Sequence, residues 1–166
     1  MTQVTEGAVA ARIPSLLDEP LRTLSRREPL TVAPGTSLAE CVRVIQRSGV
    51  GDSVVVADRS GRMHGVLTER DVFARLVGEP SDLQRPVESL MNARPHTLRP
   101  EQTVRDAMQL MALGPYRNIP IVDEDGIVVG MVRQQDVLRA LAESFPEELL
   151  NLPPRPHQAQ EESEGA

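Results

Sequence analysis

The sequence predicts an α/β protein built from two tandem copies of one β-α-β-β-α unit. The first observation is an internal repeat: the second half of the chain reproduces prolines, glycines and aspartates of the first half in register. The second is that short apolar runs alternate with segments of helical apolar spacing in both halves. A unit of about 65 residues is too small to bury a good core alone. We therefore expect the two copies to pack together.

The register of the repeat follows from identical residues at a fixed spacing. At a spacing of 66 positions the matched pairs are Pro20 and Pro86, Leu24 and Leu90, Pro29 and Pro95, Thr31 and Thr97, and Pro34 and Pro100. One residue is then missing, and at a spacing of 65 the pairs are Asp58 and Asp123, Gly61 and Gly126, Gly65 and Gly130, Asp71 and Asp136, Val72 and Val137, and Leu76 and Leu141. Proline, glycine and aspartate determine turns and helix starts, so the match indicates shared backbone geometry.

The repeats divide the chain into five segments. A lead-in segment covers residues 1–19, in which Ile13, Leu16 and Leu17 could form a short helix. The first repeat covers 20–78, a polar linker covers 79–85, and the second repeat covers 86–144. The remaining residues, 145–166, are rich in proline and acidic side chains, so we expect a disordered tail.

Each repeat begins with a short extended piece next to a proline, at 30–33 and 96–99. A helix follows, because Ser37 with Glu40 forms a capping-box pattern and Thr103 with Asp106 forms a weaker version of it. The apolar residues that recur at helical spacing are Leu38, Cys41, Val42 and Ile45 in the first repeat and Val104, Ala107, Met108 and Met111 in the second.

Two strands and a second helix complete each repeat. Residues 54–57 and 119–122 are continuous apolar runs, as expected of strands buried on both faces. Four-residue turns that start with aspartate and end with glycine follow, at 58–61 and 123–126. The next strands are expected over 63–67 and 127–132, and the last helices begin at Glu69 and Gln134.

Composition excludes several function classes. The net charge of −6 and the scarcity of aromatic residues argue against a general nucleic-acid binder or a binder of anionic membranes. All 18 basic residues are arginine, so Schiff-base chemistry and a phosphate-binding lysine are excluded. No signal peptide or transmembrane run is present, and we expect a cytoplasmic protein. Cys41, the one cysteine, is expected to be a buried thiol.

The strongest candidate for chemistry is the start of the last helix in the first repeat. Thr68 and Asp71 lie three residues apart on its first turn, where free N–H groups and the helix dipole favour anions. This pair can hold a polyol through its hydroxyls and a phosphate through N–H donors. The same spacing is also that of a plain capping box, and these residues alone leave both interpretations open.

Taken with the duplication, these motifs resemble the CBS-domain pair, or Bateman module. The resemblance covers about residues 20–144 and is carried by 53–65, by 118–130, and by the Thr68 and Asp71 segment with its degenerate copy. It implies two repeats paired about a pseudo-twofold axis. It also implies clefts between them that take adenosine compounds: AMP, ADP, ATP or S-adenosylmethionine. Such pairs commonly form homodimers. Apolar residues of the last helices could supply that interface or could belong to the intramolecular core: Val72, Leu76, Val137, Leu138 and Leu141.

The resemblance also assigns site residues in the first repeat. Asp71 would accept the ribose hydroxyls, and Thr68 would contact phosphate or ribose. The residues expected to line the base pocket of this repeat are Thr31, Val32, Val50 and Gly51.

The second repeat departs from the pattern. Asp136 is retained, but Arg133 replaces the hydroxyl residue. Arg133 could bind a phosphate as a charge-assisted fork, or it could pair with a nearby acid and close the site. Arg117 is a candidate phosphate contact, although it could equally form a solvated salt bridge, and its counterpart in the first repeat is Asp52. The two clefts are therefore expected to differ.

The sequence suggests three alternative functions. The first is a regulatory module that senses an adenosine compound and acts on an unknown partner protein. The second is a dimerising scaffold whose ligand sites have degenerated. The third, an enzyme, is disfavoured because no nucleophile–base pair is visible. A metal site is not expected, because His64, His96, His157 and Cys41 lack ligand spacing, and the acidic run at 123–125 matches a hairpin turn better than a calcium loop.

Overall fold

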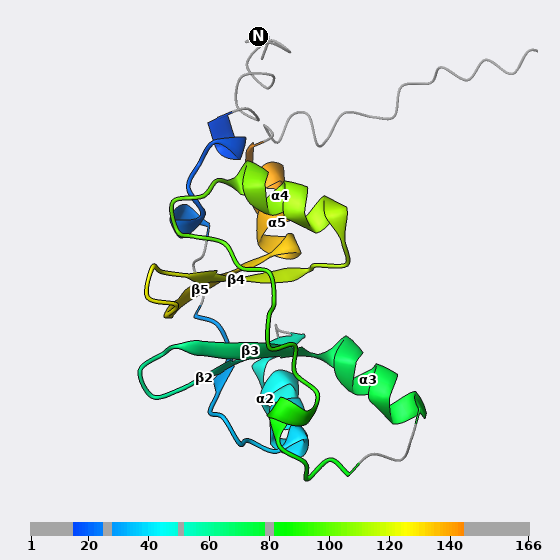
Figure 1. Cartoon of the computed structure of the whole chain (residues 1–166). Helices are drawn as coiled ribbons and strands as arrows, with labels where there is room; N and C mark the ends of the chain where they lie inside the picture. The colour runs from blue at the N-terminus through cyan, green and yellow to red at the C-terminus, as the bar shows by residue number, and fades with distance from the viewer. Residues whose placement is uncertain (1–14, 25–27, 50–51, 79–81, 145–166) are drawn as a thin grey trace, which may run out of the picture.

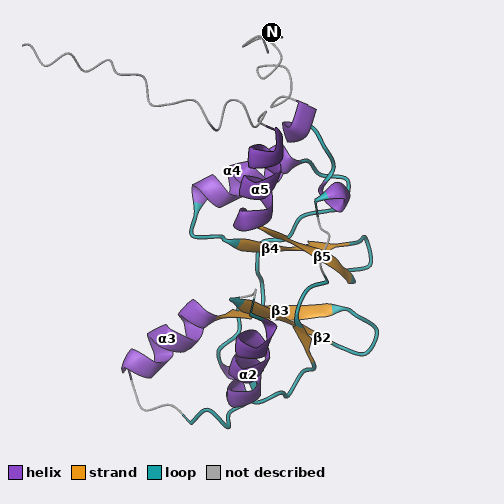
Figure 2. Ribbon diagram, turned by 180° about the vertical axis from the view of Figure 1, so that it is seen from behind, coloured by secondary structure: helices purple, strands orange, loops and turns teal. Residues whose placement is uncertain are grey.

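Two small sheets face each other at the centre of the molecule, and the helices lie on their outer sides (Figure 1). The structure, a computed structural model, describes residues 15–24, 28–49, 52–78 and 82–144. The expected linker lies partly outside this range, and the expected tail lies wholly outside it. Seen from behind, helices α2 and α3 cover one sheet and α4 and α5 cover the other (Figure 2).

The predicted β-α-β-β-α order is confirmed in the first repeat, and in the second it is confirmed except that the first strand is a single bridge; element ends differ by a residue or two. In the first repeat the elements are β1 (Thr31–Val32), α2 (Leu38–Ser48), β2 (Ser53–Ala57), β3 (Met63–Thr68) and α3 (Glu69–Gly78). In the second they are α4 (Val104–Leu113), β4 (Asn118–Val122), β5 (Val128–Arg133) and α5 (Gln134–Ser144). In the first sheet β1 runs parallel to β2, and β2 runs antiparallel to β3. In the second sheet β4 runs antiparallel to β5.

The first strand of the second repeat, expected over 96–99, is reduced to a single bridge between Leu98 and Ile121. In the first repeat the N–H of Val55 donates to the carbonyl of Leu30 at 2.8 Å. Pro120 occupies the position that matches Val55, and a proline has no N–H to donate. The extended piece of the second repeat therefore pairs over fewer residues than β1 does.

Both helices, α2 and α4, begin with the expected side-chain cap. The prediction of which cap forms the full reciprocal box was wrong. Ser37 Oγ accepts only the N–H of Glu40, at 3.2 Å, because the Glu40 carboxylate pairs with Arg43 at 2.6 Å instead. Thr103 and Asp106, which we expected to be the weaker pair, form the full reciprocal box. The N–H of Thr103 donates to Asp106 Oδ2 at 2.8 Å.

Each repeat is completed by the short 3-10 helix with which the other repeat begins. Leu21, in the 3-10 helix η1 (Leu21–Thr23), is fully buried in the core of the second repeat. Its N–H donates to the carbonyl of Gln102 at 2.8 Å. Val87, in η2 (Val87–Ser89), is fully buried in the core of the first repeat, and its N–H donates to the carbonyl of Thr36 at 2.8 Å. The two repeats are thus interlocked.

The facing sheets are joined by a small apolar layer and by their hairpin turns. Val55, Val66 and Met131 form the buried layer between the two sheets. At the hairpin ends, Met63 N–H donates to the carbonyl of Gly126 at 3.0 Å, and Val128 N–H donates to the carbonyl of Gly61 at 2.9 Å. These reciprocal bonds fit two copies related by a pseudo-twofold axis.

Candidate functional site

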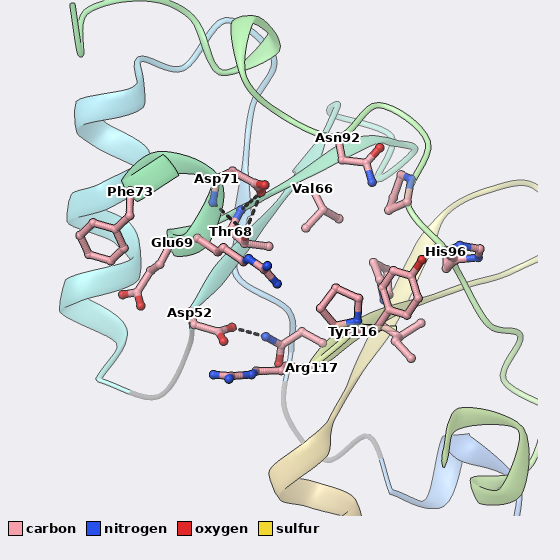
Figure 3. Close-up of a pocket in the computed structure, with 16 residues that line it drawn as sticks. Asp52, Val66, Thr68, Glu69, Asp71, Phe73, Asn92, His96, Tyr116 and Arg117 are labelled. Carbon is pink, nitrogen blue, oxygen red and sulfur yellow. Dashed lines mark hydrogen bonds between the residues drawn. The ribbon is translucent and has the colours of Figure 1, made fainter. Parts of the chain in front are cut away.

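A cavity of about 860 Å³ lies between the repeats, beside the start of α3 (Figure 3). The first repeat contributes Thr68, Asp71 and Phe73 to its wall. The second repeat contributes residues from the segment before β4, among them Tyr116 and Arg117. Its volume lies in the range of pockets that bind small molecules. It is larger than the second cavity, which is described below.

Thr68 and Asp71 form a reciprocal cap and also line this cavity. Asp71 Oδ2 accepts the N–H of Thr68 at 2.9 Å and its hydroxyl at 2.6 Å, while the N–H of Asp71 donates to Thr68 Oγ1 at 3.2 Å. Among the described residues, no donor reaches the other carboxylate oxygen, Oδ1. The capping interpretation is therefore correct, and it leaves an acceptor for a ligand.

The facing wall carries the one tyrosine of the chain. Tyr116 packs edge-on against His96, with ring centroids 4.7 Å apart and an interplanar angle of 67°. Both rings line the cavity, together with Pro95 and Pro115. Gly114 leaves room for the tyrosine, because a Cβ at that position would lie 2.5 Å from the ring. This aromatic wall can pack against a planar group such as a nucleobase.

The base pocket that the sequence predicts for the first repeat differs from the lining of this cavity. Val50 and Gly51 lie outside the described residues, but at a spacing of 65 their counterparts are Pro115 and Tyr116, which line the cavity of Thr68 and Asp71. The cavity thus combines the helix start of one repeat with the segment before the first long strand of the other. The Gly-Pro-Tyr run at 114–116 was the signal in the sequence, but its place in the fold was needed to interpret it.

Thr31 and Val32 line neither cavity. Val32 is buried in the core of the first repeat, because β1 pairs with β2 and turns this side chain inward. Thr31 is exposed. These two cavities therefore give no support to the expected contact of Thr31 and Val32 with a base, which stays a prediction.

Asp52, Arg117 and Asn118 line both cavities. Asn118 Nδ2 donates a hydrogen bond to Asp52 Oδ1, which connects the two repeats at this shared wall (Figure 3). The Arg117 side chain is exposed and makes no ion pair with any described residue. Arg117, predicted as a phosphate contact, thus lies where a ligand in either cavity could meet it.

The second cavity measures about 380 Å³ and lies at the start of α5. Arg133 lines it and is 9% exposed. Its Nη1 lies 4.0 Å from Asp136 Oδ2, beyond hydrogen-bond range, and makes no hydrogen bond with any described residue. Asp136 is not among the residues that line the cavity. Pairing with an acid, one of the two expectations for Arg133, is thus present only as a long contact.

Cys41 is fully buried on the inner face of α2, as expected. Burial raises the pKa of its thiol to about 11. Because the thiolate is the reactive form, Cys41 should react with a disulfide reagent at pH 8 far more slowly in the folded protein than in denaturant. Absorbance of the released thiol measures both rates, and equal rates would contradict the burial.

In the described segments, no group of three or more histidine, cysteine, aspartate or glutamate side chains is placed to hold a metal ion. No helix in those segments has the length and apolar character needed to cross a bilayer.

Two interlocked β-α-β-β-α repeats with cavities between them define a tandem-repeat α/β module. The chain belongs to the CBS domain family, whose model matches residues 21–78 and 87–143. The resemblance noted in the sequence is therefore confirmed.

The chain is similar to the following three proteins. A CBS domain-containing protein of Bacillus subtilis, YhcV, is 34% identical over 64% of this chain and 74% of its own length. An uncharacterized protein of Methanopyrus kandleri is 28% identical over 70% of this chain, and the match spans 59% of that protein. The solved structure of a CBS domain protein from Pyrobaculum aerophilum complexed with AMP aligns with a TM-score of 0.66 and 25% identity, covering 75% of this chain and 99% of that one.

Proposed function

We propose that this chain is a regulatory module that binds an adenosine compound in the cavity of Thr68 and Asp71. One observation carries the proposal: a carboxylate with an unused acceptor oxygen faces an aromatic wall across a cavity of about 860 Å³. The carboxylate suits the hydroxyls of a ribose, and the aromatic wall suits a base. The AMP complex of the Pyrobaculum aerophilum protein supports this choice of ligand.

The charges around the cavity favour a ligand with few phosphates. Three carboxylates line it, from Asp52, Glu69 and Asp71, against two guanidinium groups, from Arg70 and Arg117. A triphosphate would bring several negative charges close to those carboxylates, which costs free energy in a partly enclosed site. Among the candidates AMP, ADP, ATP and S-adenosylmethionine, we therefore place AMP and the cationic S-adenosylmethionine first.

Regulation of a partner requires that the ligand prefer one arrangement of the module over another. The cavity wall comes from both repeats, so a ligand there contacts both and can shift their relative position. We propose that an unknown protein partner in the cytoplasm detects this shift, and that the module itself performs no catalysis.

We also propose a homodimer through the last helices. Phe73 on α3 and Leu138 on α5 occupy matching positions of the two repeats and are 63% and 58% exposed. Val72 and Val137, the neighbouring candidates, are buried in the intramolecular cores and are not available. Exposed apolar side chains at both equivalent positions favour one shared interface. This surface is also what the alternative function, a dimerising scaffold, would use.

Thermal unfolding with added ligand tests the binding proposal. At an AMP concentration of about 100 times the dissociation constant, the free energy of unfolding should rise by about 2.7 kcal/mol. GMP, which carries the same ribose phosphate on a different base, serves as the control and should give a smaller shift. No shift with millimolar AMP or S-adenosylmethionine would contradict the proposal and favour the scaffold.

A further inference from the structure

We propose that the second cavity is an oxyanion site, in which Arg133 binds a phosphate or carboxylate rather than a nucleoside. Apart from Gly49, the described residues that line this cavity are polar or charged, whereas the first cavity has Tyr116, His96 and Phe73. The described residues of the second cavity thus offer a base no ring to stack on.

The charge of the second cavity suits an anion. Two guanidinium groups, those of Arg117 and Arg133, line it against the single carboxylate of Asp52. That carboxylate already accepts a hydrogen bond from Asn118. The first cavity has the opposite balance, with more carboxylates than guanidinium groups on its wall.

The Arg133 side chain gives a separate indication that the second cavity binds an anion. It is nine-tenths buried, and its Nη1 has no hydrogen-bond partner among the described residues. A buried guanidinium N–H without an acceptor costs free energy, which Asp136 at 4.0 Å offsets only in part. An oxyanion held by this side chain would supply the missing acceptor through a charge-assisted bond.

The start of α5 adds donors to the same cavity. In α3 the Thr68 hydroxyl accepts the N–H of Asp71, but in α5 Arg133 replaces that hydroxyl. Among the described residues, no side chain accepts the N–H of Gln135 or Asp136, while the N–H of Gln134 donates to the carbonyl of Arg117 at 2.8 Å. Gln134 and Gln135 line the cavity, so the positive end of this helix faces it.

Titration of the full chain with inorganic phosphate, followed by ¹H–¹⁵N spectra at constant ionic strength, tests this site. We expect saturable shifts at the amides of Gln134 and Gln135. The variants R133M and R117Q should each weaken phosphate binding about tenfold or more, and R139Q, an exposed arginine on α5, should leave it unchanged. Should R133M fail to fold, R117Q at an exposed position still decides the question.

A second titration identifies the source of the oxyanion. If it is the phosphate of a nucleotide in the first cavity, R133M weakens AMP and leaves adenosine unchanged. If it is a separate ion, phosphate shifts the same two amides with AMP already bound. Either result supports the site. Amide shifts that do not saturate with phosphate, or equal phosphate affinity in wild type, R133M and R117Q, would overturn the oxyanion site. The proposal that Asp71 binds an adenosine compound would be unaffected.

Discussion

Replacing Asp71 with asparagine is expected to weaken AMP binding about tenfold or more, while the fold is retained. Asparagine keeps an oxygen that accepts the N–H of Thr68, so α3 remains capped. It removes the negative charge and exchanges one acceptor for a donor, so a ribose hydroxyl loses a charge-assisted bond worth about 1.5–3 kcal/mol. Isothermal titration calorimetry with AMP measures the loss.

The chain offers a matched control in Asp106. This residue caps α4 with the same geometry, in which Thr103 N–H donates to its Oδ2 at 2.8 Å, but it lines neither cavity. D106N should therefore change stability as D71N does and leave AMP affinity unchanged. Equal affinities in D71N and D106N would mean that Asp71 is only a helix cap.

Replacing Leu21 with alanine should lower the free energy of unfolding by about 2–5 kcal/mol. Leu21 is fully buried and packs in the core of the second repeat beside Leu98, Val104 and Ile119, although it lies at the start of the first repeat in the sequence. Truncation leaves a cavity that the strands beneath can fill only in part. Urea denaturation followed by circular dichroism measures the change.

Leu113, on α4 and 84% exposed, provides the control for this loss. L113A should change the free energy of unfolding by less than about 0.5 kcal/mol. Hydrogen exchange should also show that L21A loosens β4 and β5 of the second repeat more than β2 and β3. A loss confined to the first repeat would contradict the interlocked arrangement.

The order of elements could be predicted from the sequence because the signals are local. Continuous apolar runs located β2 and β4 to within a residue, and the Asp-to-Gly turns located the hairpins. The shortened first strand of the second repeat was missed, because the effect of Pro120 depends on which N–H the neighbouring strand needs.

The arrangement across the repeats could not be predicted from local signals. Leu21 and Val87 lie in 3-10 helices of three residues, too short to show an apolar period. Two similar copies also offer two similar cores, and only the tertiary packing assigns each residue to one of them. The same ambiguity affected the site. Thr68 and Asp71 were identified by their spacing, whereas the wall of Tyr116 and His96 comes from the other copy.

In the proposed function, one cavity built from both repeats holds an adenosine compound between Asp71 and Tyr116. A crystal structure of the full chain grown with AMP tests it most directly. We expect the ribose hydroxyls to lie within hydrogen-bond distance of the Asp71 carboxylate and the adenine to pack on the Tyr116 ring. AMP bound elsewhere, with Asp71 facing only solvent, would contradict it.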